Sequence, residues 1–203
     1  MTITQIMPLE HTKGKVQVSF DNSQTLILYK GELRKYGLQE QEPLSDERYH
    51  ELYYEVVGKR AVKRAMHLLE KMDRTEGQLR KKLMEGGYPD DLIEQAVAYV
   101  KSYHYIDDDR YARTFVRLNQ DRKSAARMKT DLLSKGVGMD VIERAIEEEM
   151  DTAPETLIQK MMQKKHFDPE CATPKETAKM YQFLLRRGFC SSEIAHAIRD
   201  TDL

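Results

Sequence analysis

The sequence predicts an all-α fold of three tandem three-helix repeats that form an elongated, curved array, preceded by a short N-terminal β-hairpin. Three observations support this prediction. A pattern of apolar residues and glycine recurs three times, strand-like alternation is confined to the first thirty or so residues, and the chain is 33% charged but only 40% hydrophobic. A low apolar content over 203 residues suits several small cores in series better than one large interior.

Two short strand-like runs lie near the N-terminus. Val16, Val18 and Phe20 alternate with polar residues, and residues 26–29 form a second apolar run. The polar residues 21–24 separate the two runs, so the pattern predicts a hairpin. A two-stranded hairpin is marginal in water, and we therefore expect it to pack on another element.

A long helix is predicted from Ser45 to about Met72. Ser45 is a favourable N-cap residue, and acidic residues follow it in the first turn. Ala61, Ala65 and Leu68 then recur at helical spacing.

The repeated pattern has periods of 49 and 52 residues. Its three copies are Leu79, Leu83 and Gly87; Met128, Leu132 and Gly136; and Met180, Leu184 and Gly188. In each copy the two apolar residues lie one turn apart on the same helix face. Glycine then stands where a helix ends in a left-handed residue. An apolar residue follows each glycine, and a second apolar helix stripe begins five residues later.

Helix-capping residues precede each copy. Thr75 and Thr173 are followed three residues later by Gln78 and Glu176, as in a capping box, and Ser124 is the equivalent in the second copy. Thr173 lies 15 residues before its glycine, against 12 for the other two, which predicts a longer middle helix in the third repeat. We therefore divide the chain into an N-terminal segment (1–57), module 1 (58–106), module 2 (107–150) and module 3 (151–203).

Several classes of protein are excluded. No run approaches the roughly 20 apolar residues of a membrane span, and the N-terminus lacks the features of a secretory signal. Two cysteines make no disulfide framework, so we expect a cytoplasmic protein. The sequence contains no glycine-rich phosphate loop and no nucleophile motif, and we expect neither enzymatic activity nor a cofactor.

Two further motifs resemble a known family. Residues 74–88 read RTEGQLRKKLMEGGY and residues 105–116 read YIDDDRYARTFV. Together with the repeat they resemble the RecX family, whose members typically carry (R/K)-S-x-x-E-L-x-x-K-L-x-x-K-G-(F/Y) and then G-Y-(L/I)-(D/N)-D-x-x-(F/Y)-A. The resemblance covers about residues 58–200. It departs at His104, where glycine often precedes the tyrosine, at residues 123–128, and around residues 166–173, where residues are added.

The resemblance implies a non-enzymatic regulator of the RecA recombinase. Such proteins bind the RecA filament on single-stranded DNA, lodge in its groove, and suppress ATPase and strand exchange. We expect a monomer whose modules contact more than one RecA protomer of the filament. A weak direct contact with DNA is a further possibility that the resemblance leaves open. The alternative is a stand-alone DNA-binding protein with helix-turn-helix-like modules, against which the net charge of −1 counts.

Basic side chains are the candidate filament-binding residues. Module 1 has ten basic residues against seven acidic ones, the only basic excess in the chain. The full candidate set is Lys59, Arg60, Lys63, Arg64, Arg80, Lys81, Lys82, Arg110, Arg113, Arg117, Lys164, Lys165, Arg186 and Arg187. The competing interpretation is a solvated helix face in which these residues pair with acids at i,i+4 spacing.

The residues of the second motif are interpreted as structural. They are Tyr105, Asp107, Asp108, Tyr111 and Phe115. Acids at this position suit a helix N-cap and the positive end of the helix dipole. A calcium loop that started at Asp107 would need glycine at its sixth position, where Ala112 stands.

Two other clusters of side chains each have two interpretations. Tyr99, Tyr103 and Tyr105, with Tyr111 and Phe115, could form a base-stacking platform, but their spacing favours packing where modules meet. Cys171, Cys190, His166 and His196 could ligate zinc, but no pair of them has the short spacing of structural zinc sites.

Overall fold

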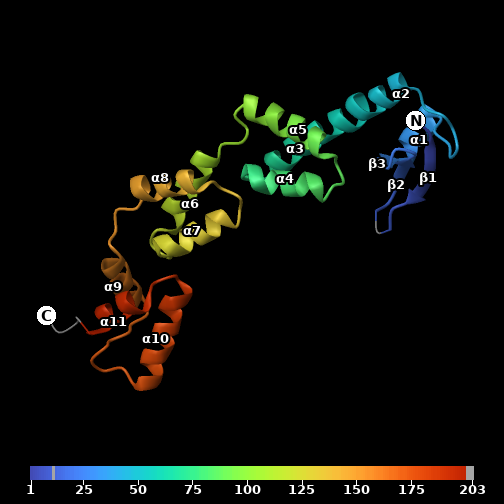
Figure 1. The fold of residues 1–203 in the computed structure, drawn as a ribbon. Coiled ribbons are helices and arrows are strands. Elements are labelled where there is room, and N and C mark those ends of the chain that lie inside the picture. Colours follow the sequence, from blue (N-terminus) through green and yellow to red (C-terminus); the bar gives the residue numbers. More distant parts are fainter. Residues whose placement is uncertain (11, 200–203) are drawn as a thin grey trace. The chain divides into compact units, whose positions relative to one another are not determined.

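The computed structural model describes residues 1–10 and 12–199 and divides into two units, 1–106 and 107–203 (Figure 1). Residues 200–203, the end of the segment assigned to module 3, lie outside the described residues. The helical repeat fold with N-terminal β structure is confirmed, with corrections before residue 60. Within the described residues, no helix is long and apolar enough to cross a membrane.

The N-terminal β structure is a three-stranded antiparallel sheet rather than a hairpin. Strands β2 (Lys15–Phe20) and β3 (Thr25–Tyr29) are the two predicted runs, and β1 (Ile3–Pro8) pairs with the outer edge of β2. In β1 only Ile3 is buried, so the strand lacks the alternation that identified the other two. In β2 the inward residues alternate strictly, and Val16, Val18 and Phe20 are buried.

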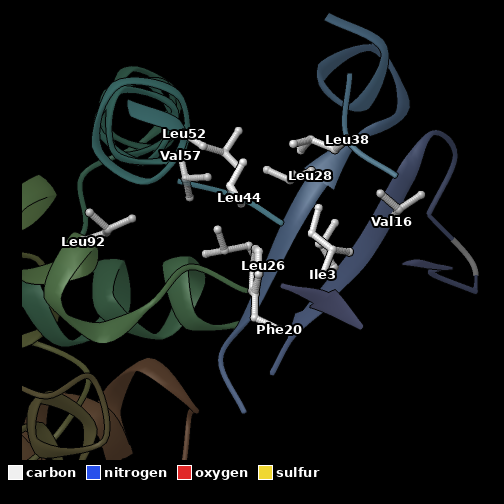
Figure 2. Close-up of a cluster of buried hydrophobic side chains, with 11 residues drawn as sticks. Ile3, Val16, Phe20, Leu26, Leu28, Leu38, Leu44, Leu52, Val57 and Leu92 are labelled. Carbon is white, nitrogen blue, oxygen red and sulfur yellow. The ribbon is translucent and has the colours of Figure 1, made fainter. Parts of the chain in front are cut away.

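One face of the sheet packs against helix and loop residues of the same unit. Figure 2 shows Ile3, Phe20, Leu26 and Leu28 converging with residues from later in the chain. Those later residues are Leu38, Leu44, Leu52, Val57 and Leu92. The sheet therefore obtains the packing partner that an isolated hairpin would lack.

The predicted 45–72 helix is one helical run with three parts. Ser45 caps α2 (Asp46–His50) by accepting a hydrogen bond from the Arg48 backbone N–H. A π-helical segment, η1 (Glu51–Gly58), follows, and α3 (Lys59–Lys71) completes the run. A short helix that was not predicted, α1 (Lys30–Tyr36), precedes the run and buries none of its residues.

The three predicted modules each contain three helices. Module 1 comprises α3, α4 (Glu76–Met84) and α5 (Asp90–Ser102). Module 2 comprises α6 (Asp108–Asn119), α7 (Ala125–Leu133) and α8 (Met139–Glu149), and module 3 comprises α9 (Pro154–Lys164), α10 (Pro174–Arg186) and α11 (Ser191–Arg199). Each triplet has its own cluster of buried apolar side chains, so the prediction of small cores in series is confirmed.

The middle helices begin and end as predicted. Thr75, Ser124 and Thr173 cap α4, α7 and α10, and α10 has 13 residues where α4 and α7 have 9. Gly87, Gly136 and Gly188 all adopt positive φ angles. In each repeat the glycine and its successor donate their backbone N–H groups to carbonyls of the last helical turn, which is the Schellman motif.

A histidine ends α5 in the same way. His104 adopts φ 55°, and the following Tyr105 N–H donates to the Val100 carbonyl. Glycine adopts this left-handed conformation without a Cβ penalty, which agrees with the glycine expected at this position from the resemblance.

Candidate interaction surface

The fourteen basic candidates divide into two groups by their ion pairs. Six have carboxylate partners in the chain: Lys59, Arg60, Arg80, Lys82, Arg113 and Arg117. Eight have no carboxylate within 4.0 Å among the described residues: Lys63, Arg64, Lys81, Arg110, Lys164, Lys165, Arg186 and Arg187. The second group has charge available for a partner.

Arg60 connects the sheet to module 1. Its guanidinium donates to both carboxylate oxygens of Glu32, at 2.7 and 2.9 Å, and to the Ile27 carbonyl. It also lies over the rings of Tyr29 and Tyr88. The Arg60 side chain is only 19% exposed, so its donors are used within the chain.

Arg80 is also held by neighbouring helices. It pairs with Glu76 at 2.6 Å on its own helix and with Glu94 on α5. Lys101 pairs with the other oxygen of Glu76 at 2.7 Å. Of the basic run 80–82, Lys81 alone is exposed without a carboxylate partner among the described residues.

Module 2 contains an ion-pair network that joins its first and third helices. Asp107 accepts the Arg110 backbone N–H and caps α6, as predicted. Asp109 accepts from Arg113 Nε at 2.6 Å and from Arg144 Nη2 on α8 at 2.9 Å. The hydrogen bond from Arg113, followed by the one from Arg144, holds the pKa of the Asp109 carboxyl below its ordinary value.

The network makes module 2 sensitive to acid. Because the folded-state pKa of Asp109 is depressed, its contribution is complete above the ordinary pKa of 3.8 and is lost as the pH falls further. At neutral pH we expect Asp109→Asn to lower stability by about 1 kcal/mol or less, because these side chains are about one-third exposed. The gap between the two proteins should close below about pH 4, measured as thermal midpoints across a pH series.

Asp151→Asn is the matched control, because this exposed aspartate forms no ion pair within the described residues. It should follow the wild-type protein at every pH. A gap between Asp109→Asn and wild type that keeps its size down to pH 2 would contradict the assignment.

The aromatic candidates separate by location. Tyr111 and Phe115 pack against the core of module 2 itself, whereas the predicted packing was where modules meet. Tyr99, Tyr103 and Tyr105 are 41%, 56% and 48% exposed, so the packing prediction is wrong for them. Because α5 ends at Ser102, Tyr105 lies outside the helix and stacks on Tyr103 with ring centroids 5.9 Å apart.

A basic cluster lies where the start of α7 meets the end of α10. Ser124 Oγ donates to the Gly188 carbonyl at 2.6 Å, and Ser124 N–H donates to the Arg187 carbonyl at 2.9 Å. This contact brings Arg122, Lys123 and Arg127 close to Arg186 and Arg187. The first three were missed from the sequence, because nothing in the spacing relates residues 122–127 to residues 183–188.

Two hollows open at this contact, and Phe183 lines both. One, of about 290 Å³, is lined by Lys123, Arg127, Phe183, Arg186 and Arg187. The other, of about 360 Å³, is lined by Asp121, Arg122, Met161, Lys164, Lys165, Phe183 and Arg187. Lys165 Nζ and Arg187 Cζ lie 5.3 and 5.1 Å from the centroid of the Phe183 ring.

Among the described residues, no three His, Cys, Asp or Glu side chains, the cysteine and histidine candidates included, are grouped so that they could hold a metal ion. Cys171 and Cys190 are exposed free thiols. Hydrogen bonding to Asp168 raises the pKa of the Cys171 thiol.

Comparison with known proteins matches the three helical triplets to three domain families. Residues 61–99, 107–146 and 154–198 match the first, second and third three-helix domains of RecX. The Regulatory protein RecX of Clostridium perfringens (strain 13 / Type A) is 26% identical over 210 residues, which cover 98% of this chain and 97% of the relative. The protein of the same name from Serratia proteamaculans (strain 568) is 30% identical over 162 residues, which cover 68% and 95%.

Two solved structures share the fold. The crystal structure of a regulatory protein RecX has a TM-score of 0.59 at 22% identity and covers 98% of both chains. The structure of RecX from Lactobacillus salivarius has a TM-score of 0.55 at 22% identity, over 72% of this chain and 97% of the other.

Proposed function

Because this chain belongs to the RecX family of regulatory proteins, we propose that it binds the RecA recombinase filament on single-stranded DNA and inhibits its ATPase and strand exchange. We propose that it does so as a cytoplasmic monomer, by binding rather than by catalysis, in the control of recombination and DNA repair.

The observation that carries this proposal is the distribution of cations without carboxylate partners among the described residues. Lys63, Arg64 and Lys81 belong to module 1 and Arg110 to module 2. Module 3 carries Lys164, Lys165, Arg186 and Arg187. Several weak contacts in series give avidity for a partner that is itself a repeating filament. Exposed cations attract a charged partner, and this attraction does not require a deep pocket in the protein.

Recombinase ATPase on single-stranded DNA tests the proposal. ATPase should fall as increasing amounts of the protein are added to preformed filaments. An unchanged ATPase at stoichiometric amounts, under conditions where filaments form, would refute it. Salt-sensitive duplex binding with no effect on the recombinase would instead support the stand-alone DNA-binding alternative.

Charge reversal tests the module 1 surface. We expect Lys63→Glu with Lys81→Glu to raise the concentration needed for half-inhibition about tenfold, because repulsion replaces two exposed attractions. Lys13→Glu with Lys30→Glu makes the same charge change in the N-terminal segment and should leave inhibition nearly unchanged. Equal effects of the two double variants would show that only net charge matters.

A further inference from the structure

We propose that the two hollows beside Phe183 form a binding site for successive phosphate groups of a single-stranded nucleic acid. This site lies within residues 121–187 and does not depend on the recombinase. We define the joint site as the positively charged residues that line either hollow: Arg122, Lys123, Arg127, Lys164, Lys165, Arg186 and Arg187.

The first argument is charge without compensation. Asp131 pairs with Lys123 at 2.8 Å and with Arg127 at 3.1 Å. The other five cations of the joint site have no carboxylate within 4.0 Å among the described residues. Asp121 lines the larger hollow but forms no ion pair there within that distance. A group of like charges gathered in this way favours binding of an anion.

The second argument is that the protein holds these charges in place. Lys165 from the end of α9 and Arg187 from the end of α10 both lie over the Phe183 ring. Arg187 also donates to the Arg122 carbonyl at 3.2 Å. The cation–π contacts and this hydrogen bond offset the mutual repulsion of the two side chains and reduce the ordering required when an anion binds.

The third argument concerns the kind of anion. Three of the five uncompensated cations are arginines, whose planar guanidinium donates two parallel hydrogen bonds to a phosphate. The hollows share Phe183 and Arg187 as a common wall, so an occupant of both places at least one anionic group on each side of that wall. The phosphates of a nucleic acid strand meet that requirement. A single strand can bend to enter both hollows, whereas a stiff duplex resists such bending.

Binding of a labelled oligothymidylate of about 20 nucleotides, followed by fluorescence anisotropy with no recombinase present, tests the site. Lys164→Glu with Arg186→Glu removes one cation from each hollow and leaves the Ser124–Gly188 contact intact. We expect the affinity to fall at least tenfold. The dependence of log affinity on log salt should flatten by about 1.4, since each lost phosphate contact removes about 0.7 on single strands.

Lys160→Glu with Lys175→Glu is the matched control, because both exposed lysines belong to α9 and α10 but line neither hollow. This control should retain affinity within about twofold and give the same circular dichroism and thermal midpoint as the test variant. Phe183→Leu keeps an apolar side chain but removes the ring and should weaken binding about two- to fivefold.

Three outcomes would overturn the proposal. The first is an equal loss of affinity in the test and control variants. The second is an unchanged affinity in the test variant. The third is displacement of the oligonucleotide by polyglutamate as effectively as by unlabelled oligothymidylate at equal charge, which would assign the site to acidic protein segments. Because the assay contains no recombinase, its result is separate from that of the ATPase test.

Discussion

Alanine in place of Gly188 should lower the stability of the 107–203 unit by about 3 kcal/mol. Gly188 has φ +90°, which costs any other residue about 1–2 kcal/mol. A Cβ at this position would also lie 2.5 Å from Arg127 Cβ and 3.0 Å from the Arg127 backbone nitrogen. Since backbone cannot swing aside as the end of a side chain can, the end of α10 must move away from α7.

Hydrogen exchange gives the local measurement for this prediction. Ser124 should lose its bonds to Arg187 and Gly188, so the amides at the start of α7, Arg127 and Met128, should exchange faster. Gly37→Ala is the control, because Gly37 has φ +61° but nothing within 4 Å of the added Cβ. It should cost only about 1 kcal/mol. Equal losses of stability in the two variants would mean that the clash at the α7–α10 contact adds nothing to the cost of the backbone conformation.

Leu92→Ala should cost the 1–106 unit about 3 kcal/mol and act mainly on the N-terminal sheet. Leu92 is fully buried on α5 and belongs to the core of the sheet, whereas its neighbour Ile93 belongs to the core of module 1. Truncation leaves a cavity between sheet and helix (Figure 2). The expected signature is faster amide exchange in β2 with little change in α4, whose buried residues belong to the core of module 1.

Met84→Ala provides the comparison for Leu92→Ala, since Met84 is 61% exposed in the same unit. It should change stability by no more than about 0.5 kcal/mol. If Leu92→Ala accelerated exchange uniformly across residues 1–106, the sheet and module 1 would be a single cooperative element, contrary to the expectation.

The repeat was predictable from sequence because each of its signals is local. Thr75, Ser124 and Thr173 cap the helix that immediately follows, and the glycines end it through bonds within one turn. Such features depend on residues at most five apart, and they were placed correctly. The longer third middle helix followed from the same spacing.

Strand β1 and the π-helical segment η1 were not predictable from local signals. Strand β1 forms because β2 offers an unpaired edge, and its own residues show no alternation. The π-helical segment η1 lies inside a run whose apolar pattern also fits an ordinary α-helix. In both cases the tertiary surroundings decide the local conformation.

The sequence also could not predict which cations form ion pairs within the chain and which remain exposed for a partner. Arg60 meets Glu32, 28 residues away, and Arg117 meets Glu149, 32 residues away. Lys164 and Arg186 have no such partner among the described residues and instead join a cluster with residues 122–127. Only the folded chain separates cations that hold the protein together from cations that face solvent.

The extra turn of α10 has a consequence for how such chains can vary. Its buried pair, Met180 and Leu184, has the same sequence separation from Gly188 as the buried pairs of α4 and α7 have from the glycines that end those helices. The additional residues therefore lie at the N-terminal end, where 173–176 are exposed. Mutation can lengthen or shorten a middle helix there without disturbing its core, and the same end is a suitable position for inserting a label or a short peptide.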